Sequence, residues 1–307
     1  MGIIKIKFKF FSFTQSSLYC AKYLTLITNS LQKIHKILIG VAFSPNLKAN
    51  IFEAVRLANV FDAELVGVHV GTKSEQKKRD LKAILEEADS LKNPGKTIWK
   101  EGNPVDVILE TCTQENIDLL ILGALQKENL LKYYVGSIAR KITRKAPCSV
   151  LLLIKPAIER VPCKHIVVNG LKDERTEETI KTSFILSEKL NCNKITIVEE
   201  VSQTELQVKV SDDKTLRKAT IAKERLRNRE DQRVKHILED INNKNITVKT
   251  QSIFGKRGYS IGHYAKVKRA DLLVMNAPNK LGFLDRIFPH DLEYILSELP
   301  TDVLIVK

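Results

Sequence analysis

The sequence predicts an α/β protein built from two tandem halves, each with a five-stranded parallel sheet covered by helices on both faces. Short runs that are apolar at nearly every position alternate with longer segments whose apolar residues recur at helical spacing. That alternation is typical of parallel strands buried between two layers of helices. The same order of elements occurs twice, and 307 residues are enough for two such cores.

Nine elements are expected in the first half. The strands are expected within 35–45, 63–70, 96–102, 117–124 and 148–155, and the helices within 46–62, 74–92, 103–116 and 135–146. Ile51, Ala54 and Val55 illustrate the helical spacing of the first helix. Pro104 suits a first helical turn, where its missing N–H would have no partner anyway.

The second half repeats this scheme. The strands are expected within 163–171, 194–201, 246–255, 270–277 and 301–307, and the helices within 175–191, 233–245, 259–268 and 290–299. The segments NIDLLILGA and RADLLVMNA correspond, with Asp118 opposite Asp271, and Pro147 lies opposite Pro300 at the same offset. A duplicated unit explains this match. The predicted organisation is an extension at 1–34, domains at 35–156 and 163–307, and a basic helical insertion near 202–235.

The net charge of +14 has two main sources. Residues 1–36 carry six lysines and no acid, and residues 214–235 carry nine basic residues against three acids. Because no aromatic residues are interleaved with the basic helix, we expect a solvated helix face and no specific nucleic-acid partner. Binding of a protein partner through the projecting part of that helix stays open.

Other whole-chain features point to a cytoplasmic protein. No apolar run approaches the roughly 20 residues needed to cross a bilayer, so no membrane partner is expected. The five cysteines form no CxxC pair, which favours reduced thiols. Residues 1–34 have a basic start and four phenylalanines but no clear cleavage site. We expect them to form a poorly ordered extension, with a stray alternating strand as the alternative.

The stretch GALQKENLLKYYVGS, residues 123–137, carries the main functional signal. Gly123 closes an apolar strand, and the pair Gly136–Ser137 opens the next helix. Glycine lets a backbone approach phosphate closely, and the N–H groups and dipole of a helix N-terminus attract an anion. The same residues are compatible with an ordinary strand-end turn and helix N-cap. The pattern alone does not decide between the two interpretations.

The order and the amino-acid sequences of these segments resemble those of the universal stress protein family. The resemblance rests on KILIGVAFSP, EGNPVDVILE, DLLILGA and GSIARKITRKAPCSVLLLI, and it extends over about residues 35–307 as a tandem two-domain member. It implies two Rossmann-like domains of the adenine-nucleotide α-hydrolase-like kind, paired within the chain through their last strands. A further homodimer of whole chains stays open.

ATP-binding members of that family carry glycines after the fourth strand and a final Gly-Ser or Gly-Thr, which suggests ATP or another adenine nucleotide as the cofactor. In the first half, Gly123, Gly136 and Ser137 match this motif, whereas Gln126 replaces its second glycine. Ala42 stands where these members place an aspartate that contacts the nucleoside. The candidate nucleotide-binding residues are therefore Ala42, Leu122, Gly123, Gln126, Gly136, Ser137 and Ile138. Phe43 is expected either to stack on a base or to lie in the core.

The second half departs further from the motif. Its equivalent positions are Gly170, Asn276, Asn279, Pro289 and His290. Pro289 has no N–H to offer a phosphate, so nucleotide binding by this half is not expected. A diverged site for another polar ligand stays open.

No catalytic residue is expected. The sequence has no Gly-x-Ser-x-Gly elbow, HExxH, Walker A lysine or His/Cys metal spacing, so neither a catalytic group nor a metal ligand is named. Glu199–Glu200 is interpreted as an ordinary charged pair at a strand end. The leading hypothesis is a non-catalytic, cytoplasmic stress-response module with a degenerate nucleotide site in its first half. The alternatives are a slowly ATP-hydrolysing protein and an interaction protein whose pockets are vestigial.

Overall fold

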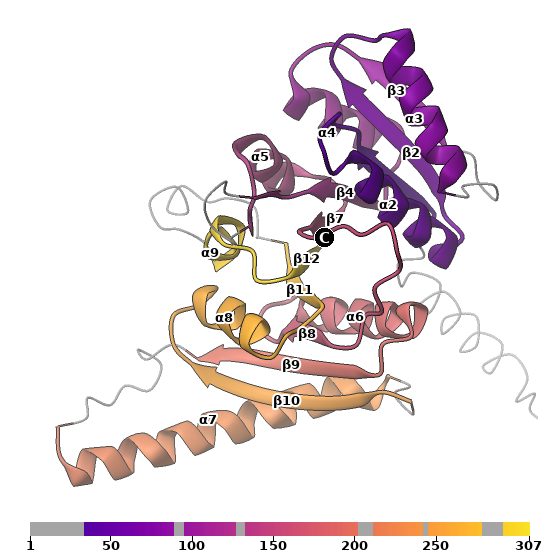
Figure 1. The fold of residues 1–307 in the computed structure, drawn as a ribbon. Coiled ribbons are helices and arrows are strands. Elements are labelled where there is room, and N and C mark those ends of the chain that lie inside the picture. Colours follow the sequence, from indigo (N-terminus) through magenta and orange to yellow (C-terminus); the bar gives the residue numbers. More distant parts are fainter. Residues whose placement is uncertain (1–33, 89–94, 127–132, 202–210, 242–244, 278–290) are drawn as a thin grey trace, which may run out of the picture. The chain divides into compact units, whose positions relative to one another are not determined.

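The computed structural model describes residues 34–88, 95–126, 133–201, 211–241, 245–277 and 291–307. Residues 34–307 form one compact unit (Figure 1). The predicted extension at 1–34 lies outside the described residues apart from Ile34.

The described strands form one large sheet. In the first half they are β1 (Lys36–Gly40), β2 (Glu64–Val70), β3 (Lys96–Lys100), β4 (Leu119–Gly123) and β7 (Ser149–Leu153). In the second half they are β8 (Ile166–Asn169), β9 (Lys194–Val201), β10 (Thr247–Phe254), β11 (Leu272–Asn276) and β12 (Asp302–Val306). Their order across the sheet is β10-β9-β8-β11-β12-β7-β4-β1-β2-β3. The α/β prediction is confirmed, and five parallel strands from each half share this sheet.

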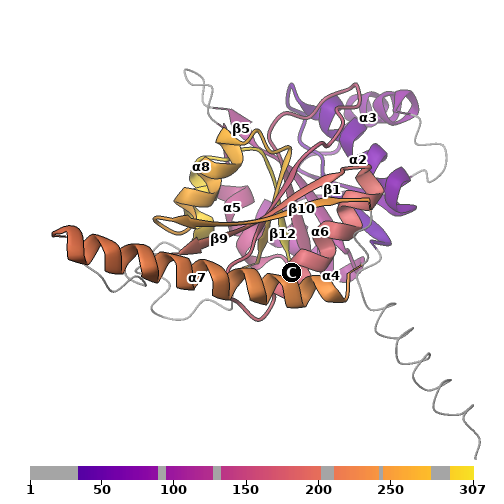
Figure 2. The same ribbon diagram turned by 90° about the horizontal axis from the view of Figure 1, so that it is seen from below.

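The helices cover both faces of the sheet (Figures 1 and 2). They are α2 (Leu47–Phe61), α3 (Glu75–Glu87), α4 (Pro104–Gln114), α5 (Ser137–Lys145), α6 (Thr176–Leu190), α7 (Asp213–Glu239), α8 (Tyr259–Val267) and α9 (Asp291–Ser297). One apolar core includes residues of α4, α5, α8 and α9, and the other includes residues of α2, α3, α6 and α7. A small hairpin of β5 (Leu125–Gln126) and β6 (Tyr133–Tyr134) was not predicted.

Local signals fix where the helices begin. The Ser74 side chain accepts the N–H of Lys77 at α3, and the Asn103 side chain accepts the N–H of Val105 at α4. Both are N-cap interactions that satisfy a helical N–H without an intrahelical partner. At α7, Asp212 and Thr215 form a reciprocal capping box.

The internal repeat extends to the backbone. Among the described residues, the non-glycine residues with positive φ form two equivalent pairs, Asp62 with Asn191 and Asn116 with Arg269. Asp62 and Asn191 end α2 and α6 in the left-handed conformation. Each precedes a strand at the same place in its half, so the two halves use the same turns.

The matching aspartates of the two halves have a common structural role. The Asp118 carboxylate accepts the N–H groups of His35 at 2.8 Å and Lys36 at 2.9 Å. The Asp271 carboxylate accepts the N–H groups of Lys164 at 2.7 Å and His165 at 2.9 Å. Asp118 thus connects the start of β1 to the start of β4, and Asp271 connects the start of β8 to the start of β11.

The two halves meet at β7 and β12, which pair antiparallel. Just beyond this pairing, the N–H of Ile154 donates to the Asp302 carboxylate at 2.8 Å, and the N–H of Lys307 donates to the Ser149 hydroxyl at 3.2 Å. Residues 154 and 307 each follow the last strand of a half, whereas 149 and 302 each begin it. The contact therefore has approximate two-fold symmetry.

Candidate functional site

The carboxyl ends of β1 and β4 form the topological switch point of the first half. Within the order β3-β2-β1-β4-β7, the chain runs from β1 outward to β3 in one direction and from β4 to β7 in the other. Open α/β sheets bind ligands in the crevice outside the strands at such a point. Ala42 and Gly123 are both exposed at this edge, because β1 and β4 are adjacent and parallel.

Gly123 is required by a close contact with α2. A Cβ atom added to Gly123 would lie only 2.9 Å from Nδ2 of Asn50. The Oδ1 atom of Asn50 is buried and has no hydrogen-bond partner among the described residues. A buried amide oxygen without a partner is unfavourable. The strand end therefore combines a side-chain-free backbone with an unsatisfied acceptor.

Gly136 and Ser137 begin α5. Gly136 is the N-cap residue, and a Cβ atom added to it would lie 2.9 Å from Cδ1 of Leu125, two residues beyond Gly123. Ser137 and Ile138 are exposed, and Ile138 retains 48% of its accessible surface. The first N–H groups of a helix have no intrahelical acceptor, so this end can receive an anion.

The remaining candidates of the first half have different environments. Leu122 is buried and packs in the sheet core next to the site. Gln126 lies in β5, but its side chain is outside the described residues. The structure therefore places Ala42, Gly123 and Ser137 as exposed groups and Leu122 as a supporting one.

An aromatic group that the sequence analysis did not identify lies beside this edge. The rings of Phe43 and His69 have centroids 5.0 Å apart, and His69 and Trp99 are also 5.0 Å apart. The interpretation of Phe43 as a core residue is wrong, because it keeps 36% exposure just beyond β1. The contact partners lie on β2 and β3, and no local sequence pattern brings them to Phe43.

Hydrogen bonds fix the tautomer of His69. Its Nδ1 atom lies 2.9 Å from the carbonyl oxygen of Val41, and its Nε2 atom lies 3.3 Å from Nζ of Lys77. Because a carbonyl only accepts, Nδ1 carries the proton and Nε2 accepts from Lys77. Lys77 also lies over the Phe43 ring, 5.4 Å from its centroid.

At the equivalent edge of the second half, a side chain replaces the glycine. Asn276 takes the place of Gly123, and its side-chain amide donates to the carboxylate of Asp173 at 3.3 Å and to the hydroxyl of Thr176 at 3.1 Å. The candidates Asn279, Pro289 and His290 lie outside the described residues.

The strand-end hydrogen bonds give the register between the halves. The N–H of Gly170 donates to the carbonyl of Val198, as the N–H of Val41 donates to that of Val68. Gly170 is therefore equivalent to Val41, and Leu171 is the residue equivalent to Ala42. A Cβ atom at Gly170 would lie 2.8 Å from Cγ2 of Ile197, so packing within the sheet accounts for this glycine.

The interpretation of Glu199 and Glu200 as an ordinary charged pair is wrong, because both are buried. Arg233 of α7 bonds the Glu199 carboxylate at 2.9 Å and the Glu230 carboxylate at 2.7 Å, and it also donates to the carbonyl of Gly170. Burial and the hydrogen bond that Glu199 donates to Glu230 raise the pKa of Glu199 to about 8. The sequence does not indicate this, since 34 residues separate Glu199 from Arg233.

Glu200 has a separate role at the start of α8. Its carboxylate accepts the N–H of Gly258 at 2.8 Å and that of Ile261 at 2.7 Å. The buried carboxylate satisfies these two N–H groups and complements the helix dipole. It thereby holds the first turn of α8 in place.

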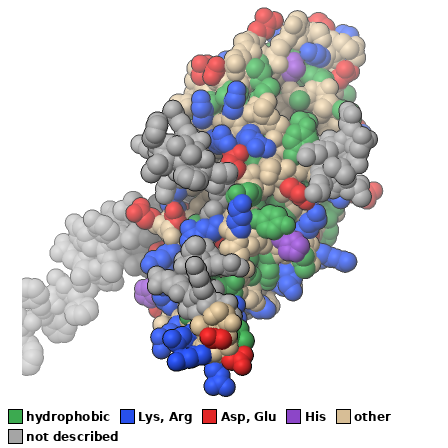
Figure 3. All heavy atoms as spheres, turned by 90° about the vertical axis from the view of Figure 1, so that its left-hand side faces the viewer, with side chains coloured by type: hydrophobic (Ala, Val, Ile, Leu, Met, Phe, Trp, Pro, Cys, Tyr) green, Lys and Arg blue, Asp and Glu red, His purple; other side chains and the backbone are tan. Residues whose placement is uncertain are grey.

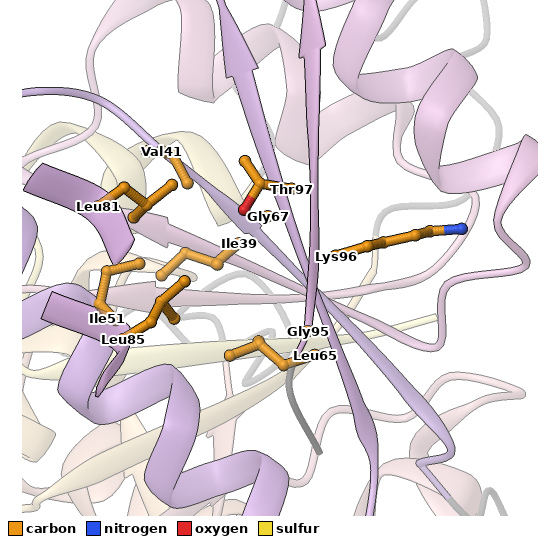
Figure 4. Close-up of a pocket in the computed structure, with 10 residues that line it drawn as sticks. All are labelled: Ile39, Val41, Ile51, Leu65, Gly67, Leu81, Leu85, Gly95, Lys96 and Thr97. Atoms are coloured by element: carbon orange, nitrogen blue, oxygen red, sulfur yellow. The ribbon is translucent and has the colours of Figure 1, made fainter. Parts of the chain in front are cut away.

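A narrow apolar hollow lies between α3 and the strands β1 and β2 (Figure 4). Its lining is Ile39, Val41, Ile51, Leu65, Gly67, Leu81, Leu85, Gly95, Lys96 and Thr97. The apolar side chains point into it, whereas the Lys96 side chain extends away (Figure 4). It contains none of the predicted site residues and offers few polar groups, so it is a packing gap between helix and sheet.

The described residues were also searched for a metal site and for a membrane-spanning helix. Within them, no group of three or more His, Cys, Asp and Glu side chains is placed to hold a metal ion. No helix in the same ranges is both long and apolar enough to span a bilayer.

Comparisons with known proteins place this fold and site in context. Residues 33–153 match the model of the Universal stress protein family. A universal stress protein of Methanocaldococcus jannaschii is 28% identical over 125 residues, which cover 34% of this chain and 74% of the relative. The Bacillus subtilis universal stress protein YxiE is 23% identical over 145 residues, which cover 39% of this chain and 98% of the relative.

Solved structures resemble both halves together. The crystal structure of a putative universal stress protein from Pseudomonas aeruginosa has a TM-score of 0.66 at 16% identity, covering 91% of this chain and 95% of that one. A universal stress protein from Archaeoglobus fulgidus has a TM-score of 0.61 at 14% identity, covering 90% and 99% of the two chains. These matches show a shared fold over nearly the whole chain.

Proposed function

We propose that this chain, whose residues 33–153 match the model of the Universal stress protein family, is a non-catalytic stress-response module that binds one adenine nucleotide in its first half. The second half shares the fold and serves as a permanent partner domain. The ligand class follows from the resemblance of residues 123–137 to the motif of ATP-binding family members.

The observation that carries this proposal is the open strand end at Gly123. Gly123 is exposed, and the Oδ1 atom of Asn50, which has no partner in the described part of the chain, lies beside it. The N-terminus of α5 begins at Ser137 after a glycine that packs on Leu125. Phosphate oxygens at this position would accept N–H groups from the helix, and an amino or hydroxyl group of the nucleotide would satisfy Asn50.

The second half supports an asymmetric function. Asn276 carries a side chain where Gly123 has none, and its amide is engaged by Asp173 and Thr176. Arg233 donates to the Gly170 carbonyl at the neighbouring strand end. A nucleotide would have to displace both sets of contacts, so one nucleotide per chain is expected.

A thermal-shift titration with ATP, ADP and AMP, with and without magnesium, tests the proposal. At a nucleotide concentration one hundred times Kd, the folded state gains about 2.7 kcal/mol, which raises Tm by several degrees. Gly123→Asn introduces the second half's side chain into the first, and we expect it to remove this response. The reciprocal variant Asn276→Gly is the matched control and should respond like the unmodified chain.

Three results would count against the proposal. One is the absence of any shift with all three nucleotides at millimolar concentration, which would favour an interaction protein with vestigial pockets. Another is an unchanged response in Gly123→Asn, which would place the site elsewhere. The third is phosphate release from ATP that Ser137→Ala abolishes, since a non-catalytic module requires no turnover.

A further inference from the structure

A second surface, on the other half of the molecule, has the chemistry of a binding site. It begins with α7, whose N-terminal part extends past the carboxyl end of β10 (Figure 1). Six basic side chains of this part are exposed: Lys214, Arg217, Lys218, Lys223, Arg225 and Arg227. Between residues 214 and 227, Glu224 is the one acid. Lys and Arg side chains gather over this end of α7 in Figure 3.

One aromatic side chain lies next to these charges, and others follow close behind it in the chain. Nζ of Lys223 lies 5.2 Å from the ring centroid of Phe254, the last residue of β10. Five residues further on, Tyr259 begins α8 and keeps 63% of its surface exposed. Its ring is parallel to that of His263, with centroids 6.5 Å apart. A basic side chain and an exposed aromatic pair therefore lie within a few residues of the carboxyl end of β10.

The loop between β10 and α8 connects the two sets of groups. Lys256 lies in this loop, and its Nζ atom is 4.4 Å from the ring centroid of Tyr294 on α9. The buried Glu200 carboxylate holds the N–H groups on either side of Tyr259, at Gly258 and Ile261. Because these bonds fix the backbone around Tyr259, little backbone entropy would be lost when its ring binds a ligand.

We propose that this surface binds single-stranded nucleic acid without sequence specificity, with phosphates along the basic side chains of α7 and a base stacked on Tyr259. Such binding combines a positively charged path for the backbone with aromatic platforms for the bases. The basic helix has no interleaved aromatics in its own sequence, but β10 brings the Phe254 ring to it. Sequence-specific recognition is not part of the inference, and the site is independent of the nucleotide site in the first half.

The described groups favour this partner over two others. A membrane surface requires an apolar helix face, but the exposed Leu216 and Ile221 are five residues apart and point about 140° away from each other around α7. An acidic peptide would satisfy the positive charge but would make no use of the exposed parallel rings of Tyr259 and His263. A single strand offers both phosphates for the basic side chains and bases for these rings.

Fluorescence anisotropy with the full chain tests the proposal. The probes are labelled oligouridine and oligothymidine of about 12 nucleotides, with a duplex of equal length and polyglutamate as comparisons. The single strands should bind more tightly than both comparisons, and binding should weaken steeply between about 50 and 200 mM salt. Tyr259→Ala should weaken binding by about 5-fold or more, the lower end of one base-stacking contact.

Charge variants complete the test. The pair Lys214→Glu with Lys218→Glu should weaken binding and reduce the slope of log affinity against log salt by roughly 1.4, as two lost phosphate contacts imply. The matched control is Lys164→Glu with Lys189→Glu, two exposed lysines near the amino ends of β8 and β9. This control has the same net charge and should bind more tightly than the α7 variant.

The expected pattern also separates this surface from the first-half site, since Gly123→Asn should leave single-strand binding unchanged. The proposal is overturned if neither single strand binds at about 100 μM protein and low salt, where non-specific binding is normally detected. It is equally overturned if polyglutamate or duplex binds as tightly as the single strands, or if Tyr259→Ala has no effect while melting like the unmodified chain.

Discussion

Replacing Asp302 by asparagine tests how burial of one carboxylate affects the junction between the halves. Asp302 begins β12, and its carboxylate accepts the N–H of Ile154 at 2.8 Å across the β7–β12 pairing. Burial raises its pKa from 3.8 to about 7, and the charges of Glu53 and Asp271 act in the same direction. The carboxyl is therefore more easily kept neutral in the folded chain than in the unfolded one.

The magnitude and sign follow from this difference in pKa. A rise from 3.8 to about 7 corresponds to roughly 4 kcal/mol that the ionised carboxylate costs in the folded state. Since the folded-state pKa is raised, the group's contribution to stability is complete below about pH 4 and is lost as the pH rises through 7. Asparagine keeps the oxygen that accepts from Ile154 and cannot ionise.

Urea unfolding of both chains between about pH 4 and pH 8 measures the effect. We expect nearly equal unfolding free energies at the acidic end and an advantage of about 2–4 kcal/mol for Asp302→Asn at the alkaline end. Ser149→Ala is the matched control, because Ser149 occupies the symmetric position and accepts the N–H of Lys307. It should cost about 1 kcal/mol at every pH. Parallel pH profiles for Asp302→Asn and the unmodified chain would refute the reasoning.

Three further substitutions test the halves separately. Glu199→Gln should stabilise the fold at alkaline pH. The pKa of Glu199 is raised to about 8, so the unmodified chain loses stability as the pH rises through that value. An advantage confined to acidic pH in the same urea assay would contradict this. Asp118→Ala should lower the free energy of unfolding by about 1–3 kcal/mol, because it leaves the N–H groups of His35 and Lys36 without an acceptor. Asp271→Ala should have the same effect. Unequal losses in chemical unfolding would show that the two aspartates are not equivalent.

The sequence predicts the elements of this fold well because each carries a local signal. Apolar runs mark the central strands, and Ser74, Asn103 and Asp212 mark helix starts by their capping side chains. The correspondence of Asp118 and Asp271 is also visible in the sequence, although its cause is a hydrogen bond to residues more than 80 positions away. The strand-end glycine was identified for the same reason, since glycine is a local backbone signal.

The parts that sequence analysis missed depend on contacts between distant segments. Burial and Glu230 raise the pKa of Glu199, which also pairs with Arg233 from α7, and nothing near Glu199 in the sequence indicates burial. The exposed position of Phe43 depends on His69 and Trp99, which β2 and β3 bring to the same edge. In each case the residue type is visible in the sequence, but its partner is chosen by the tertiary fold.

The two halves differ mainly at one edge of the shared sheet. At the amino ends of the strands both use an aspartate in the same way. At the carboxyl ends the same strand-end carbonyl is met by His69 in the first half and by Arg233 in the second. The first half thus has the His69 ring and an exposed glycine at this edge, and the second has Arg233 and the basic helix α7. This difference is the reason for proposing different ligands for the two halves, a small nucleotide for the first and an extended polyanion for the second.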